Sequence, residues 1–164
     1  MMKSLVAVVA VFAATVSAES HTVTLNNKCG KGTPVFQVAG GQEFSGQGSH
    51  TVNGPIKGGL AWIKGAFGCG DANGLNCGDV EFTLINPGDD VGNTQNAVDY
   101  SLVKNSGNHV FKYRMDFQAH GCTLQPAHKP CTGGTQQQCP GAFTTPTDGT
   151  VFQCTGSDVG VSYP

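Results

Sequence analysis

Two carboxylates in separate apolar segments could do chemistry together. Glu81 lies in the run Val-Glu-Phe-Thr-Leu at residues 80–84, and Asp99 lies in the run Val-Asp-Tyr-Ser-Leu at residues 98–102. If both side chains faced one cleft, they could act as acid and base, or as acid and nucleophile, on a glycosidic bond. The alternative is that each occupies the solvent face of a half-exposed strand, because alternating strands turn their polar residues outward. The residues alone favour this second interpretation.

A second cluster contains two histidines and two cysteines within twelve residues: His120, Cys122, His128 and Cys131. Such a set could supply a tetrahedral zinc shell. Its spacing is not that of the common zinc fingers, and thiols of a secreted chain usually oxidise before they meet zinc. We therefore expect no metal. We also expect no cofactor, because the glycine-rich stretch 58–70 contains neither a phosphate loop nor a dinucleotide fingerprint.

A secretion signal precedes all seven cysteines. Residues 1–18 combine a charged start, a short apolar run and the small residues Val16-Ser17-Ala18, which predicts a signal peptide cleaved after Ala18. The apolar run is shorter than the roughly 20 residues of a membrane span, so we expect no membrane insertion. The mature part, residues 19–164, is expected to be a single domain that is secreted to the extracellular space or the cell wall. An oxidising compartment favours disulfides, and an odd number of cysteines leaves one thiol over.

The composition is that of a weakly charged extracellular protein. Only 20 of the 164 residues are charged (9 basic and 11 acidic), and 24 are glycine. No basic patch is visible, so nucleic acid is not an expected partner. Low charge with many turn-forming residues is typical of a compact β protein rather than of a disordered chain.

The apolar pattern predicts β-strands throughout. The clearest case is residues 109–117, where aromatic and aliphatic side chains alternate strictly with charged ones. We expect this segment to be a central strand. Other strands are expected at residues 22–26, 34–38, 49–52, 60–67, 80–85, 98–103, 150–153 and 159–163. Glycine-rich turns separate these runs, and residues 121–147 are expected to form a loop region pinned by disulfides. The predicted fold class is an all-β sandwich or barrel.

The ordered motifs resemble a known family. Residues 25–34, Leu-Asn-Asn-Lys-Cys-Gly-Lys-Gly-Thr-Pro, are similar to the start of thaumatin-like domains, and most closely to the small secreted fungal members often labelled glycopeptides. Further matches follow in the family's order: Asn-Gly-Pro at 53–55, Gly-Leu-Ala-Trp-Ile at 59–63, the strands around Glu81 and Asp99, and Cys-Pro-Gly-Ala-Phe at 139–143. The resemblance covers nearly all of residues 20–164. It implies an antiparallel β-sandwich supported by disulfides, without the large second domain of plant members.

The resemblance also implies a cysteine pairing. By analogy, the pairs are Cys69–Cys77, Cys122–Cys154 and Cys131–Cys139. The family joins its first cysteine to one near the C-terminus, and here Tyr163 stands about where that cysteine would be. Cys29 is therefore expected to be a free thiol close to Tyr163. The protein is expected to be a monomer, with a dimer linked through Cys29 if that thiol is exposed.

Larger members of the family are known for antifungal activity and β-1,3-glucan binding, and some hydrolyse this glucan. Their acidic cleft contains one arginine, one glutamate and three aspartates. Glu81 and Asp99 match two of these positions, and Asp79 is the nearest counterpart of another aspartate. The arginine position falls near Ala66, and the remaining aspartate position falls on Gly141. With two of five groups matched, the resemblance implies binding more strongly than catalysis, so Glu81 and Asp99 stay catalytic candidates only.

Three functions remain open. The first is a secreted cell-wall-associated protein that binds a polysaccharide, β-1,3-glucan above all, through Glu81, Asp99, Asp79 and Trp62, whose ring could stack on a sugar. Core packing is the more usual role of a tryptophan. The second is a non-catalytic secreted effector or wall structural protein that binds an extracellular protein. The third, least favoured, is an endo-β-1,3-glucanase that uses Glu81 and Asp99.

Overall fold

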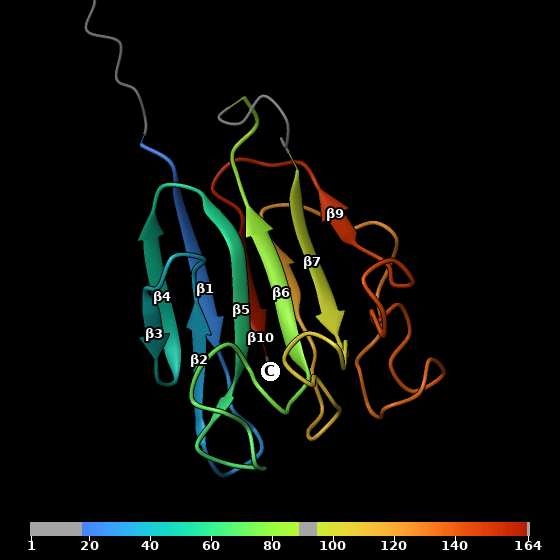
Figure 1. Ribbon diagram of the computed structural model, residues 1–164. Coiled ribbons are helices and arrows are strands. Elements are labelled where there is room, and N and C mark those ends of the chain that lie inside the picture. The colour runs from blue at the N-terminus through green and yellow to red at the C-terminus, as the bar shows by residue number, and fades with distance from the viewer. Residues whose placement is uncertain (1–17, 89–94, 164) are drawn as a thin grey trace, which may run out of the picture.

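Two β-sheets packed face to face make up the structure, a computed structural model that describes residues 18–88 and 95–163 (Figure 1). The smaller sheet has the strand order β4-β1-β10-β8. Its strands are β1 (Ser20–Leu25), β4 (Gly48–Asn53), β8 (Gln118–His120) and β10 (Gly160–Tyr163). The larger sheet has the order β3-β2-β5-β6-β7-β9. Its strands are β2 (Thr33–Gln37), β3 (Glu43–Ser45), β5 (Ile56–Lys64), β6 (Asp79–Leu84), β7 (Asn96–Ser101) and β9 (Phe152–Cys154).

The strands form because apolar and polar residues alternate along them. In β6, Val80, Phe82 and Leu84 are buried between the sheets, whereas Glu81 and Thr83 lie on the opposite, outer face and are half-buried. Strand β1 alternates in the same way, and it pairs in parallel with β10. The other pairings between named strands are antiparallel. The prediction of an all-β sandwich with mostly antiparallel strands is confirmed.

Aromatic side chains join the two sheets across the core. The ring of Phe82 on β6 lies 5.6 Å from that of Tyr163 on β10, and the ring of Phe36 on β2 lies 5.9 Å from His50 on β4. Apolar burial of this kind is the main source of stability in a sandwich of this size. The described residues contain no helix that could span a membrane. The predicted signal peptide falls on residues 1–17, outside the described part, and on Ala18.

Three disulfides brace the loops. The pairs are Cys69–Cys77, Cys122–Cys154 and Cys131–Cys139, as the family resemblance implied. The Cys131–Cys139 bridge lies in the segment 121–147, which contains no named strand and is a loop region as expected. Because disulfides persist in oxidising compartments, three of them are consistent with an extracellular protein.

The prediction of a central strand at residues 109–117 is wrong. The segment is extended, but its only β-bridge in the described structure joins Met115 to Cys131. The expected burial is largely present: Tyr113, Met115 and Phe117 are buried, and Phe111 is half-buried. The alternation of apolar and charged residues therefore reflects which side chains are buried, and it does not indicate that the segment pairs within a sheet. The short strands β3 and β8 were not predicted from the sequence.

Tyr113 shows how this segment is held without a strand partner. Its Oη donates a hydrogen bond to the carbonyl of Gly78 and accepts one from the backbone N–H of Ile63, both at 3.0 Å. The register between β5 and β6 includes Ala61 opposite Val80, and it does not continue to Ile63. The phenol thus satisfies backbone groups where these two strands separate.

Candidate functional site

The outer face of the larger sheet brings the two predicted carboxylates together. Glu81 on β6 is the direct cross-strand partner of Asp99 on β7 and of Leu60 on β5. Direct partners in an antiparallel pair have Cβ atoms about 4.5–5.5 Å apart and project from the same face. The prediction that Glu81 and Asp99 line one shared depression is confirmed.

This depression, here called the acidic groove, consists of two adjoining hollows that share Glu81 and Ser106. The first has a volume of about 330 Å³ and is lined by Glu81, Asp99, Ser101, Ser106, Phe143 and Pro146, among others. The second has a volume of about 450 Å³ and is lined by Leu60, Leu75, Glu81, Ser106, Gly107 and His109, among others. Among the described residues, no lysine or arginine lines either hollow. The groove therefore offers carboxylates, hydroxyls and apolar walls.

Burial and like charge disturb the ionisation of Asp99. Burial and, second, the nearby Glu81 carboxylate raise the pKa of Asp99 to about 7. Asp99 therefore keeps its proton in a large share of the molecules near neutral pH. A pair of this kind can both donate and accept hydrogen bonds at neutral pH.

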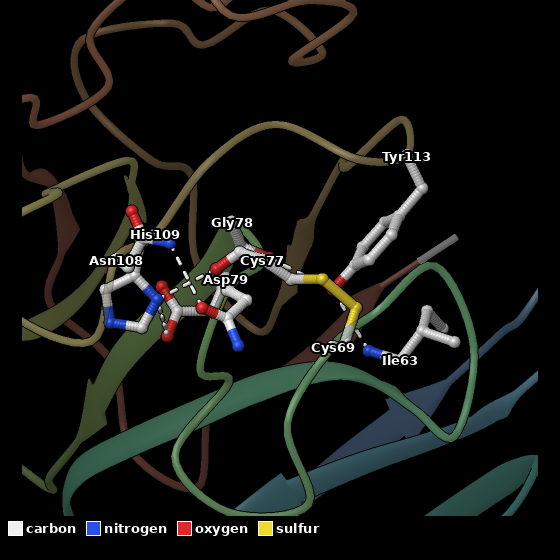
Figure 2. Close-up of a disulfide and its surroundings, with 9 residues drawn as sticks. Ile63, Cys69, Cys77, Gly78, Asp79, Asn108, His109 and Tyr113 are labelled. Carbon is white, nitrogen blue, oxygen red and sulfur yellow. Dashed lines mark hydrogen bonds and ion pairs between the residues drawn. A yellow bond between two sulfur atoms is a disulfide. The ribbon is translucent and has the colours of Figure 1, made fainter.

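Asp79 lies beneath the groove rather than in it. Its side chain is fully buried, and neither carboxyl oxygen has a hydrogen-bond partner among the described residues. Burial, together with Glu81 and Asp99, raises its pKa well above the usual value. Oδ2 lies 3.5 Å from Nδ1 of His109, and a dashed line marks this contact in Figure 2. Asp79 thus neighbours the two groove carboxylates, but the surface of the groove does not include it.

Trp62 does not reach a ligand surface in this structure. Only 3% of its surface is exposed, which is the environment of the core-packing alternative. The ring lines the small cavity near Cys29 and neither hollow of the acidic groove, so it cannot stack on a sugar bound in the groove. The apolar walls of the groove are instead Leu60, Leu75 and Phe143, and Leu75 is 42% exposed.

The zinc hypothesis is removed by the disulfides. Cys122 and Cys131 each bond to another cysteine, so neither provides a thiolate ligand. His120 Nε2 instead lies 3.0 Å from Ser162 Oγ, and the ring of His128 stacks on Phe117 with the centroids 4.2 Å apart. The described residues contain no group of three or more metal-ligating side chains arranged to hold an ion.

Cys29 is exposed and is the free cysteine, as the resemblance implied. It lines a small cavity of about 40 Å³ together with Tyr163. The backbone N–H of Asn26 donates to the carbonyl of Tyr163 at 2.7 Å, which ties this end of β1 to the end of β10. Cys29 and Tyr163 thus border the same cavity, and a direct contact between them stays a prediction.

Sequence reasoning missed His109 and Ser106 as groove residues. Both belong to the turn after β7, which contains Gly107 and Asn108 with positive φ angles of 80° and 52°. Turns on a rigid scaffold often carry function, so the Ser-Gly-Asn-His sequence was the available signal. It was overlooked because the following residues alternate like a strand.

Comparisons with known proteins add little. No family model matches the chain, and no curated protein matches it. Among solved structures, the crystal structure of the protein elicitor MoHrip2 from Magnaporthe oryzae is similar, with 12% identity and a TM-score of 0.46 over 88% of this chain and 98% of that chain. A likeness at this level supports no inference about family or function.

Proposed function

We propose that this chain is a secreted thaumatin-like protein that binds a cell-wall polysaccharide, β-1,3-glucan above all, in the acidic groove. The observation that carries the proposal is the cross-strand pair Glu81–Asp99 on an open groove between apolar walls. Sugar hydroxyls can donate to the carboxylates, and the apolar faces of a sugar ring suit walls such as Leu60 and Phe143.

The test is co-sedimentation of secreted residues 19–164 with insoluble β-1,3-glucan at pH 6. We expect the unmodified protein to bind and the double variant Glu81→Gln/Asp99→Asn to lose at least tenfold in affinity, because two hydrogen-bonding groups change. Glu43→Gln is the matched control, since Glu43 lies on β3 at the far edge of the same sheet and pairs with Lys64. Equal retention of all three proteins would contradict the proposal.

A second candidate function is hydrolysis of the same glucan. It is favoured by one observation: the pKa of Asp99 is raised to about 7 beside a second carboxylate. A carboxyl group that keeps its proton near neutral pH, beside a second carboxyl group, is an arrangement that glycosidases use. Release of reducing ends from soluble β-1,3-glucan, lost in both Glu81→Gln and Asp99→Asn, would support hydrolysis.

The non-catalytic alternative predicts a different outcome. A folded protein that binds no polysaccharide and releases no reducing ends would be a secreted effector or wall structural protein with an extracellular protein as its partner. The sedimentation assay therefore separates the first proposal from this alternative, and the reducing-end assay separates binding from catalysis.

A further inference from the structure

The buried pair formed by Asp79 and His109 has no role in the binding function proposed above. A buried carboxylate without a hydrogen bond is costly, and such a group is stabilised by keeping a proton or by a neighbouring cation. His109 is only 6% exposed and is the basic group 3.5 Å from the Asp79 carboxyl. Asp79 is fully buried, whereas His109 also lines the second hollow together with Glu81. The pair therefore reaches from the interior to the wall of that hollow.

A hydrogen bond at Nδ1 fixes the orientation of the His109 ring. Nδ1 lies 2.8 Å from the carbonyl oxygen of Cys77. A carbonyl only accepts hydrogen bonds, so Nδ1 carries the hydrogen and Nε2 of the neutral ring is an acceptor. Cys77 is held by its disulfide to Cys69, and Figure 2 shows Nδ1 turned towards Cys77 and Asp79, with the other ring nitrogen on the opposite side. In the described structure Nε2 has no hydrogen-bond partner, and it lies beside Gly107.

We propose that His109 is a ligand-contacting residue of the second hollow and that Asp79 is its positioning residue. The inference rests on the proposed function and deepens it. While the ring is neutral, Nε2 accepts a hydrogen bond from a ligand hydroxyl. Once the ring takes up a second proton, Nε2 becomes a donor, and the contact selects an acceptor oxygen instead. The ligand is then a hydroxyl-rich chain long enough to reach from Asp99, past Glu81, to His109.

The groups around the pair determine when this change happens. Glu81 on β6 and Asp99 on β7 are the charged groups beside Asp79 on the sheet. Tyr113 approaches from the segment after β7, and burial raises its pKa far above the usual range, so it stays neutral. From the loop before β6, the backbone of Gly74 packs against Asp79: a Cβ added there would lie 2.9 Å from Oδ2. Lys104, in the turn after β7, lines a further hollow together with His109, so the ionisable neighbours of the ring include a cation as well as acids.

NMR of the free protein tests the role of Asp79 without any ligand. Nitrogen shifts of the histidine rings at pH 8 should show the neutral His109 ring with its hydrogen on Nδ1. In Asp79→Asn, the side-chain amide can donate to Nδ1, so a measurable share of the neutral His109 rings should carry the hydrogen on Nε2 instead. The exposed His120 on β8 is the internal control, and its signals should not change. An unchanged His109 tautomer in Asp79→Asn, or an unmodified protein whose neutral His109 ring carries its hydrogen on Nε2, would overturn the inference.

Binding of a β-1,3-linked glucose hexasaccharide tests the contact itself. We expect His109→Gln to weaken binding about tenfold at pH 7, the effect of one lost hydrogen bond, while His120→Gln leaves it unchanged. If His109→Gln does not fold, binding by Asp79→Asn decides, and it should be weaker than binding by the unmodified protein because fewer His109 rings present Nε2 as an acceptor. Binding equal in the His109→Gln and unmodified proteins would refute the contact while the proposed function stands. If the unmodified protein does not bind, the proposed function and the ligand contact both fail, and the NMR experiment alone decides whether Asp79 positions His109.

Discussion

Glu81 and Asp99 face each other across β6 and β7 on the outer surface of the sheet. Their proximity has a consequence for stability. Because the pKa of Asp99 is raised to about 7 in the folded state from about 3.8, the folded protein binds more protons than the unfolded chain between these two values. The stabilisation is fully present below about pH 3.8 and is lost as the pH rises towards 7.

We therefore expect the unmodified protein to be more stable at pH 5 than at pH 8. Allowing for the partial exposure of Asp99, the difference is about 1–2 kcal/mol, or roughly 3–5 °C in melting temperature. Thermal unfolding followed by circular dichroism measures it. Asp99→Asn should reduce the pH dependence over this range, and the part that comes from Asp79, whose pKa is also raised, should remain. The pKa values of the exposed Asp148 and Asp158 are lowered, so both titrate at more acidic pH and do not confuse the comparison. A melting temperature that falls equally in both proteins would count against the effect.

Removing the hydroxyl of Tyr113 should destabilise the fold. Tyr113→Phe leaves the buried N–H of Ile63 and the carbonyl of Gly78 without their partner, at a cost of about 2–3 kcal/mol. Tyr100→Phe is the control, because the Tyr100 hydroxyl makes a single 3.2 Å bond to the carbonyl of Lys129. Urea unfolding should rank Tyr113→Phe as clearly the less stable variant. The reverse order would mean that the two hydrogen bonds of the Tyr113 hydroxyl contribute little to the stability of the fold.

The sequence allowed good prediction wherever local pattern and tertiary burial agree. In β6, the alternation of Val80, Phe82 and Leu84 with polar residues is also the alternation between core and surface, so the strand could be predicted. At residues 109–117 the same pattern misled, because alternation reports which side chains are buried and carries no information about a backbone partner. The disulfides were predictable through family resemblance, since connectivity cannot be deduced from cysteine spacing alone.

The candidate site likewise contains residues that could be predicted from the sequence and residues that could not. Glu81 and Asp99 lie at corresponding places in neighbouring strands, so their meeting was a natural hypothesis once the strands were placed. The role of His109 depends on contacts with Cys77 and Asp79, which are 32 and 30 positions away in the chain. Such contacts follow from the path of the loops, and no local pattern encodes that path.

The close approach of Gly107 to His109 gives a further prediction. Gly107 has a φ of 80°, and a Cβ there would lie 2.5 Å from His109 Nε2. Gly107→Ala should therefore cost about 2–4 kcal/mol, from backbone strain plus displacement of the ring. Gly65→Ala is the matched control: Gly65 has a φ of 73°, but a Cβ there would meet nothing within 4 Å, so only strain of about 1–2 kcal/mol is expected. Thermal unfolding of the two variants measures the difference. Equal losses of stability would show that the His109 ring moves aside at no energetic cost.

The free thiol of Cys29 should link two molecules in oxidising medium. Because Cys29 is exposed, its oxidation with a second copy forms an intermolecular disulfide. Non-reducing electrophoresis of secreted protein should show a dimer that disappears with reductant and in Cys29→Ser. A monomer with no free thiol by intact mass and thiol labelling would instead mean that Cys29 carries a small adduct or that the pairing differs.

The same cysteine tests the packing of the two ends of the chain. Cys29 and Tyr163 line one cavity, so Tyr163→Cys should form an intramolecular bridge and suppress the dimer. The new bridge would close a loop of about 135 residues, for which the chain-entropy model gives up to about 5 kcal/mol; loss of the buried Tyr163 ring, about 3–5 kcal/mol, works against this gain. The decisive comparison is therefore Tyr163→Cys against Tyr163→Ser, which loses the ring without gaining a bridge. The cysteine variant should melt at a higher temperature under oxidising conditions and at the same temperature after reduction. Failure to bridge, with Cys29 and Cys at position 163 both labelled as free thiols, would refute the proximity of the two ends.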